Sequence, residues 1–192
     1  MKLPTSFYTR RDVVNVARDL LGKYIYTDLP GGITGGYITE TEAYAGITDK
    51  ASHAFGNRRT PRTEVMYRKG GRAYVYLCYG IHSLFNIVTN VEDIPHAVLV
   101  RGINPTCGKD LMLKRSGKSL IDKAFANGPG KVCRILGIHW RHSGLDLSGD
   151  TIWLEDGGRK VREDKIQISP RIGIDYAEED ARLPYRFLLK KT

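Results

Sequence analysis

The chain has 192 residues and carries 30 Lys and Arg against 21 Asp and Glu, a formal net charge of +9, which suits one soluble domain with a basic surface. The charge predicts a polyanionic partner. Nucleic acid is favoured over an anionic membrane because no spanning apolar run, signal peptide or basic amphipathic helix is found.

Cysteine and histidine usage also excludes several classes of protein. The three cysteines have no C-x-x-C spacing, and the five histidines show no metal-ligand pattern. These features argue against a disulfide framework and a zinc site. We therefore expect a cytoplasmic protein that needs no metal and no cofactor.

The first part of the chain predicts a helix followed by two strands. Apolar residues recur at helical spacing over 6–22, where Ser6 or Thr9 would cap the start and Gly22 would end the helix. Strands are expected over 23–28 and 33–44, on either side of a turn rich in Pro and Gly.

The strand over 33–44 ends in an unusual polar face. The letters of 39–44, Thr-Glu-Thr-Glu-Ala-Tyr, put Glu40, Glu42 and Tyr44 on one side of the strand. Carboxylates are rarely buried unless they are paired or functional, so this face is a poor core stripe. We interpret it as an active-site strand. The alternative is a half-exposed edge strand with solvated glutamates.

Residues 46–71 are predicted to form a charged loop. Within it, 57–62 reads Asn-Arg-Arg-Thr-Pro-Arg and places three arginines beside a proline. Because a guanidinium binds phosphate bidentately, Arg58, Arg59 and Arg62 are predicted phosphate contacts. A solvated charged loop without a ligand is the alternative.

A β-hairpin is predicted over 73–89, where β-branched and aromatic residues flank a turn at Gly80. Tyr79 precedes that glycine and is expected at the hairpin tip. Asn86 interrupts an apolar run, and a buried amide needs hydrogen-bond partners. Asn86 either holds a turn or faces a pocket, and we favour the pocket.

Two further features suggest anion binding. Arg101 interrupts the apolar strand 97–103, so it needs an anionic partner, which is a structural carboxylate, Glu42 or a phosphate. The segment 128–131, Gly-Pro-Gly-Lys, is expected to open a helix that runs to Gly137, and free amides at a helix start attract anions. The segment lacks P-loop spacing, so we infer no nucleoside triphosphate site.

The remaining segments complete one domain of mixed α and β structure. The sequence shows no internal repeat, low-complexity tract or linker, so residues 1–192 are expected to form a single domain. The other expected elements are helices over 108–115 and 119–126 and strands over 151–155 and 166–169, and residues 183–187 close the chain.

These features together indicate a particular chemistry. A glutamate beside a basic surface can activate a water for attack on the carbon that carries a nucleobase, and it stabilises positive charge on the sugar. Aromatic side chains can enclose a flat base, most favourably a cationic one. Because a base inside a duplex must be flipped out first, an exposed tyrosine at a turn is suited to fill the gap.

Two other functions are compatible with parts of this pattern. A nucleic-acid-binding module without catalysis uses the basic charge and the aromatic residues but has no use for Glu42. A glycoside hydrolase uses two carboxylates, and Glu40 and Glu42 would lie about 6.6 Å apart along a strand, near the separation of inverting enzymes. The positive charge argues against a neutral sugar.

The chain resembles the alkyladenine (3-methyladenine) DNA glycosylase family. The resemblance extends from about residue 10 to residue 188, and the ordered set of short motifs is far more specific than any one of them. The matching motifs are Glu40-Thr41-Glu42-Ala43-Tyr44, Ala51-Ser52-His53, Arg59-Thr60-Pro61-Arg62, Tyr74-Val75-Tyr76-Leu77-Cys78-Tyr79-Gly80, Asn86, Val98-Leu99-Val100-Arg101, Gly128-Pro129-Gly130-Lys131 and Arg186-Phe187.

The resemblance implies roles in catalysis and base binding. Glu42 corresponds to the general base that activates water for attack on C1′. Arg101 corresponds to an arginine that positions this water and a nearby phosphate. Tyr44, His53 and Tyr76 correspond to residues that stack on the flipped base, with the His53 amide as a donor to its edge.

The resemblance also implies roles in DNA recognition. Tyr79 corresponds to the intercalating tyrosine, Met66 lies near the position of a second wedge residue, and Asn86 corresponds to a pocket residue that excludes guanine. Family members often have a His at or near Tyr176, a departure that concerns the C-terminal loop and not the chemistry. The expected phosphate contacts are Arg58, Arg59, Thr60, Arg62 and Lys131.

The family fold is a single mixed α/β (α+β) domain, with a curved, mainly antiparallel sheet, a projecting β-hairpin and surrounding helices. The implied activity is monofunctional excision of 3-methyladenine, with hypoxanthine and ethenoadenine as further candidates, at the start of base excision repair. The implied partner is double-stranded DNA that contains a damaged purine. We expect a monomer that uses water as the nucleophile.

Overall fold

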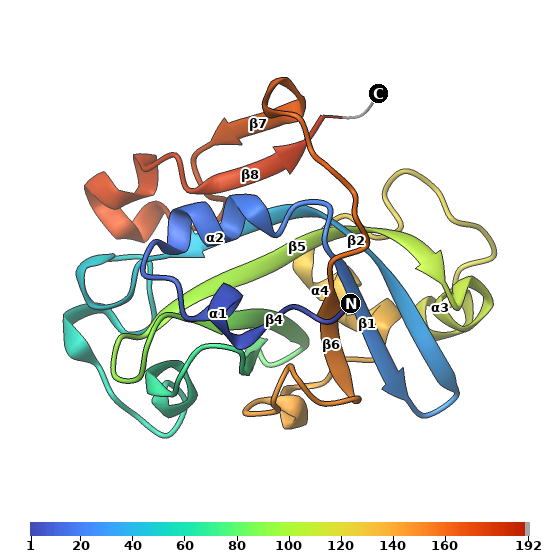
Figure 1. Ribbon diagram of the computed structural model, residues 1–192, viewed down its shortest axis with the longest axis horizontal. Helices are drawn as coiled ribbons and strands as arrows, with labels where there is room; N and C mark the ends of the chain where they lie inside the picture. The colour runs from blue at the N-terminus through green and yellow to red at the C-terminus, as the bar shows by residue number, and fades with distance from the viewer. Residues whose placement is uncertain (191–192) are drawn as a thin grey trace.

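The computed structural model describes residues 1–190 and shows one curved antiparallel sheet with helices packed against it (Figure 1). The strand order is β3-β4-β5-β2-β1-β6, and β7 joins the sheet through β8, which pairs with β2. The strands are β1 Tyr24–Leu29, β2 Gly32–Tyr44, β3 Ala73–Cys78, β4 His82–Thr89, β5 His96–Cys107, β6 Ile152–Glu155, β7 Ile166–Ser169 and β8 Arg186–Leu189.

Within residues 1–190, four α-helices and several 3₁₀ helices surround the sheet. The α-helices are α1 Thr5–Tyr8, α2 Val13–Asp19, α3 Lys109–Ser116 and α4 Pro129–Leu136. The 3₁₀ helices are η1 Gly46–Thr48, η2 Phe55–Asn57, η3 Glu64–Tyr67, η4 Trp140–His142, η5 Glu163–Lys165 and η6 Asp175–Arg182. The mixed α/β class and the mainly antiparallel sheet that the sequence predicted are confirmed.

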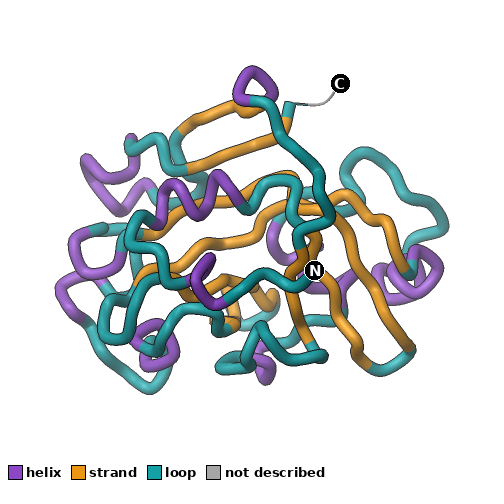
Figure 2. The backbone as a smooth tube through the Cα atoms, in the orientation of Figure 1, coloured by secondary structure: helices purple, strands orange, loops and turns teal. Residues whose placement is uncertain are grey.

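Two apolar clusters hold the elements together. In the main core, α2 packs on β2 and β5, and α4 packs on β4 and β5. Figure 1 shows α2 in front of the sheet and α4 behind it. A second cluster lies between the sheet and the loop segment 51–67, which Figure 2 shows as coil and short helices. This second cluster fixes the loop over the end of the sheet where the polar face of β2 lies.

β2 is the central strand, and irregular pairing with β5 shapes the polar region. Glu40 pairs with Gly102, whereas the next residue, Thr41, pairs with Val100, so Arg101 lies in a β-bulge. A bulge redirects the side chain of its extra residue. At the same level the other edge of β2 pairs with β8, with Glu42 opposite Arg186. Two arginines therefore flank the glutamates of β2.

Two helix predictions are wrong. The helix expected over 6–22 is divided into α1 and α2, because the Asp12 side chain accepts a hydrogen bond from the Asn15 amide at 3.0 Å and starts a new helix. Neither Ser6 nor Thr9 provides a side-chain cap at the start of α1 or α2.

No helix forms over 119–126. The left-handed Gly117 closes α3, and the Asp122 side chain then accepts a hydrogen bond from the Ala124 amide at 2.9 Å, which favours a turn.

The other segments agree with the sequence prediction. The strand expected over 33–44 is β2, the hairpin over 73–89 is β3 and β4, and the Gly-Pro-Gly-Lys segment opens α4. The strand expected over 97–103 extends to Cys107 as β5. Within residues 1–190, no helix is both long enough and apolar enough to span a bilayer.

Candidate active site

Glu42 lies at the centre of a hydrogen-bonded cluster near the end of β2, and its side chain is 0% exposed. Oε1 accepts a hydrogen bond from the Ile172 amide at 2.8 Å, and Oε2 accepts one from the Tyr44 hydroxyl at 2.9 Å. Nη1 of Arg101 lies 3.4 Å from Oε2. Three donors from three separate segments therefore fix the orientation of this carboxylate.

Glu40 is almost as buried but is bound differently. Its Oε1 accepts hydrogen bonds from Nε of Arg101 at 2.9 Å and from Nε of Arg186 at 2.7 Å. The anion that Arg101 requires is thus supplied by both glutamates. Because Glu40 is held in an ion pair with two arginines, it is poorly suited to act as the second acid of a glycoside hydrolase.

The surroundings make Glu42 a stronger base than an ordinary glutamate. Burial raises the pKa of Glu42, while Arg101, the Ile172 amide and the Tyr44 hydroxyl lower it and Glu40 raises it. The net direction is upward. Burial and the nearby Glu42 raise the pKa of Tyr44, which keeps its hydroxyl protonated as a donor.

Glu42 and the hairpin share one face of the sheet. Glu42 is paired with Leu99, Leu99 with Asn86, and Asn86 with Tyr74, so these residues form a row across four strands. Directly opposed residues in antiparallel strands project to the same face. This row connects the catalytic candidate on β2 with the aromatic residues on β3.

An aromatic cluster covers the β3 end of that row. The rings of His53 and Tyr76 have centroids 4.6 Å apart, and those of Tyr74 and Tyr76 are 5.5 Å apart. Nδ1 of His53 is 2.7 Å from the Tyr74 hydroxyl. Burial, followed by the nearby Arg62 and Arg58, lowers the pKa of His53 to about 4, so its imidazole is neutral at pH 7.

Tyr44 links this cluster to Glu42. The Tyr76 phenol is near enough to raise the pKa of Tyr44. The Arg171 guanidinium carbon lies 4.9 Å from the centroid of the Tyr44 ring. One face of the Tyr44 ring is therefore covered by a cation, and a stacked base would use the other face.

Asn86 is 3% exposed, and the hairpin itself provides acceptors for its side-chain NH2 group. Nδ2 donates to the carbonyl oxygens of Tyr74 at 3.2 Å and Leu84 at 3.4 Å. These bonds lie within the paired strands β3 and β4 and not at a turn, so they differ from the turn role that the sequence offered for Asn86. The pocket role stays a prediction, supported by the place of Asn86 in the same row as Glu42.

The hairpin tip is the most exposed apolar feature near the cluster. Tyr79 is 91% exposed and Ile81 is 74% exposed. The turn closes through a hydrogen bond from the Ile81 amide to the Cys78 carbonyl at 3.1 Å. The tip position predicted for Tyr79 is confirmed.

The wedge role predicted for Met66 is wrong. Met66 is 2% exposed and packs in the second apolar cluster, so its side chain cannot reach a duplex. Ile81, unlike Met66, is an apolar neighbour of Tyr79 that lies at the surface.

Arg59 and Arg62, two of the three arginines in residues 57–62, have different surroundings. Arg59 donates to Glu64 at 2.9 Å through both Nε and Nη2, and to Asp93 at 2.9 Å. The carbon of the Arg62 guanidinium instead lies 4.9 Å from the Tyr76 ring centroid, beside the aromatic cluster. A phosphate role therefore suits Arg62 better than Arg59.

The other predicted phosphate contacts have different surroundings. Arg58 is exposed and lies near enough to His53 to lower its pKa. The Thr60 hydroxyl lies 3.2 Å from the Thr63 hydroxyl and is engaged within the turn. Lys131 is exposed at the start of α4, where Nζ donates to the Ala124 carbonyl at 3.0 Å. The phosphate contacts of these residues stay predictions.

The segment after β7 contributes residues that sequence reasoning missed. Ile172 acts through its backbone amide and Arg171 through a buried side chain, and neither has a distinctive sequence pattern. Arg186 belongs to a quoted motif, but its contact with Glu40 was not foreseen. The Tyr176 hydroxyl donates to the Ala51 carbonyl at 3.3 Å, joining this segment to the loop that carries His53.

Comparisons with known proteins agree with this geometry. A sequence model of the methylpurine-DNA glycosylase family matches residues 6–192. A relative from Chlamydia felis that bears the name 3-methyladenine DNA glycosylase is 46% identical over 188 residues, covering 97% of this chain and 95% of its own. Relatives with the same name from Clostridium acetobutylicum and Bacillus cytotoxicus are each 43% identical, covering 99% and 100% of this chain and 95% and 98% of their own.

Proposed function

Because the chain belongs to the methylpurine-DNA glycosylase family, it is a hydrolase of N-glycosyl bonds in DNA repair, and we propose that it excises 3-methyladenine from double-stranded DNA. Hypoxanthine and ethenoadenine are included in the proposed lesion range. The observation that carries the proposal is the buried Glu42, which three donors hold beside a cluster of aromatic side chains.

Glu42 is the proposed general base. An ionised carboxylate offers about four acceptor sites, and the three donors leave about one for a proton of water. As the water oxygen attacks C1′, the N-glycosidic bond breaks, its electron pair leaves with the base, and the water proton passes to Glu42. The negative charge also stabilises the positive charge that develops on the sugar.

The aromatic cluster is the proposed binding site of the flipped base. A cationic alkylated purine gains roughly 0.5–2 kcal/mol from each aromatic face that it contacts. His53 is neutral at pH 7, so it can stack on such a base without repelling it. Tyr76 and the open face of Tyr44 supply the other aromatic surfaces, and Asn86 is the proposed discriminator against guanine.

The hairpin tip and the basic surface are the proposed DNA interface. Tyr79 would occupy the space that the flipped base vacates, with Ile81 beside it. Arg58, Arg62 and Lys131 would contact phosphates. We propose that residues 1–192 act as one catalytic domain and as a monomer. The proposed location is the cytoplasm or, in a bacterium, the nucleoid.

The test is single-turnover base release from duplexes that each hold one 3-methyladenine, hypoxanthine or ethenoadenine. Glu42→Gln should bind these duplexes as wild type does and release bases at least about 100-fold more slowly. The matched control is Glu64→Gln, which removes a glutamate at the surface. Normal release by Glu42→Gln would refute the mechanism. Tight binding without release by wild type would indicate a lesion reader.

A further inference from the structure

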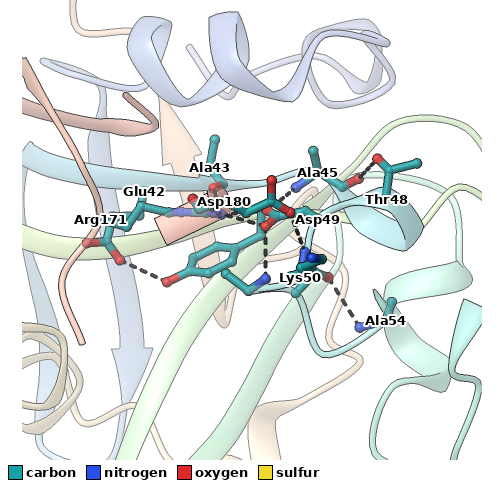
Figure 3. A network of polar contacts seen from close by, with 12 residues as sticks. Glu42, Ala43, Ala45, Thr48, Asp49, Lys50, Ala54, Arg171 and Asp180 are labelled. Carbon is teal, nitrogen blue, oxygen red and sulfur yellow. Dashed lines mark hydrogen bonds and ion pairs between the residues drawn. The ribbon is translucent and has the colours of Figure 1, made fainter. Parts of the chain in front are cut away.

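Arg171 and Asp49 form a fully buried ion pair next to the candidate base (Figure 3). Nη1 of Arg171 lies 2.5 Å from Oδ2 of Asp49, and Nη2 lies 2.9 Å from Oδ1. The two side chains are 0% and 1% exposed. Removing two charges from water is costly, and a buried pair is weak support for stability by itself. Its position therefore calls for a functional explanation.

Arg171 joins three segments that surround Glu42. Nη1 also donates to the Ala43 carbonyl at 2.9 Å, and Nη2 donates to the Asp180 carbonyl at 3.1 Å. Its guanidinium carbon lies 4.9 Å from the Tyr44 ring and 5.3 Å from the Tyr185 ring. The residue thus contacts the two positions that follow Glu42 on β2.

Asp49 anchors the other side of the pair. Its carboxylate accepts hydrogen bonds from the Ala45 amide at 2.9 Å and the Ala51 amide at 3.0 Å, which fixes the turn after β2. The Ile172 amide, one residue beyond Arg171, donates to Glu42 at 2.8 Å. A shift of Arg171 would therefore move one donor of Glu42 directly and another, Tyr44, through its ring.

We propose that Arg171 is a positioning residue for base excision, which through its ion pair with Asp49 holds the Ile172 amide and the Tyr44 hydroxyl against the Glu42 carboxylate. The inference rests on the proposed function of Glu42. The segment after β7 would thus help to position Glu42, although the residues on either side of Arg171 in the sequence are exposed. A misplacement of about 1 Å at a reacting group can lower a rate about 100-fold.

The test uses a double substitution, Arg171→Met with Asp49→Asn, which removes both charges and leaves no buried ion unpaired. Circular dichroism and thermal melting establish that the variant is folded. We expect single-turnover release of 3-methyladenine to slow about 100-fold, with full reaction amplitude and unchanged affinity for the lesion duplex. A merely structural role would lower the reaction amplitude, which reports the fraction of active protein, and would leave the rate constant unchanged.

The matched control is Lys50→Ala. Nζ of Lys50 lies 2.5 Å from Glu178 and 2.8 Å from Glu179. Lys50 therefore also joins the turn after β2 to the C-terminal segment, but at the surface and away from Glu42. Because this link does not touch the donors of Glu42, its loss should change the rate less than about twofold. The pair of variants therefore separates segment anchoring in general from the action of Arg171.

A further experiment, a mutant cycle, combines the double substitution with Glu42→Gln. If Arg171 acts through Glu42, adding its substitution to Glu42→Gln should slow release no further, whereas an independent role would cost the same factor in both backgrounds. Either an independent factor or wild-type release by the folded double variant would overturn the inference. Absence of release by wild type would instead refute the proposed function.

Discussion

Glu40 and Glu42 show how one strand gives two carboxylates different tasks. They lie two residues apart on the same face of β2, and both side chains are almost completely buried. Glu40 accepts hydrogen bonds from the Nε groups of Arg101 and Arg186, whereas Glu42 accepts from an amide, a hydroxyl and the more distant Nη1 of Arg101. Glu40 is thereby suited to orient Arg101, which leaves Glu42 for proton transfer.

The raised pKa of Glu42 predicts an effect on stability that is separate from activity. In the pH range from its ordinary value up to its folded value, the folded state binds more protons than the unfolded state. The free energy of unfolding of wild type therefore falls as pH rises through that range. Gln does not titrate, so the stability of Glu42→Gln relative to wild type should increase over the same range. Urea unfolding at a series of pH values measures this.

Glu64→Gln is the control for sign. The hydrogen bonds from Arg59 lower the pKa of Glu64, so its stabilising contribution is present above the ordinary glutamate value and is lost as pH falls. The relative stability of Glu64→Gln should therefore decrease as pH rises, opposite to that of Glu42→Gln. If the relative stabilities of the two variants changed in the same direction with pH, the conclusion that burial raises the pKa of Glu42 would be contradicted.

At the level of elements, strands were easier to predict than the site they create. Alternation and β-branched residues identified β2 and the β3–β4 hairpin, because those patterns follow from local backbone geometry. The β-bulge that presents Arg101 depends on the register between β2 and β5, which no local pattern encodes. The sequence predicted Glu42 as the general base and offered it as one partner of Arg101, but it did not predict that Glu40 shares the same arginine.

The residues that sequence reasoning missed act over long distances along the chain. Arg171 meets Asp49 only because η6 and the strand β8 return the C-terminal segment to β2. Ile172 contributes a backbone amide, which any residue except proline could supply. Met66 was misplaced for a related reason, since an apolar residue in a charged loop can cover the sheet as well as contact a ligand.

The hairpin turn predicts that function and stability are in conflict at Tyr79. Tyr79 has φ 51°, a left-handed conformation that Asn adopts more readily than Tyr. Tyr79→Asn should therefore raise the free energy of unfolding by up to about 1 kcal/mol, while weakening lesion binding through loss of the wedge. Thermal melting and duplex titration measure the two effects.

Ile81→Asn is the matched control on the same turn. Ile81 has no positive φ, so asparagine offers no conformational gain there, although its exposed apolar surface is also lost. Stabilisation by both variants would show that the gain does not come from the backbone of Tyr79. A Tyr79→Asn protein that keeps full lesion affinity would remove the tip from the proposed interface.

At the scale of the whole molecule, positive charge and exposed apolar surface meet beside the hairpin. A groove of about 600 Å³ lies between the tip and the start of α4, and Glu42 is not among the residues that line it. None of the described residues that line it is acidic, and Lys131 and Arg134 are cationic side chains in its lining. This distribution continues the basic surface beyond the proposed wedge, as a duplex held on both sides of Tyr79 would require.

The salt dependence of DNA binding should distinguish the arginines of residues 57–62. Arg59 with Glu64 and Asp93 forms a cluster of net charge −1, whereas Arg62 has no carboxylate among its contacts within residues 1–190. Because each released counterion requires a phosphate contact, Arg62→Gln should reduce the slope of log affinity against log salt by about 1. Arg59→Gln should leave the slope nearly unchanged, although both substitutions remove one positive charge. Equal slopes for the two variants would mean that net charge, not placement beside the aromatic cluster, determines how this protein holds DNA.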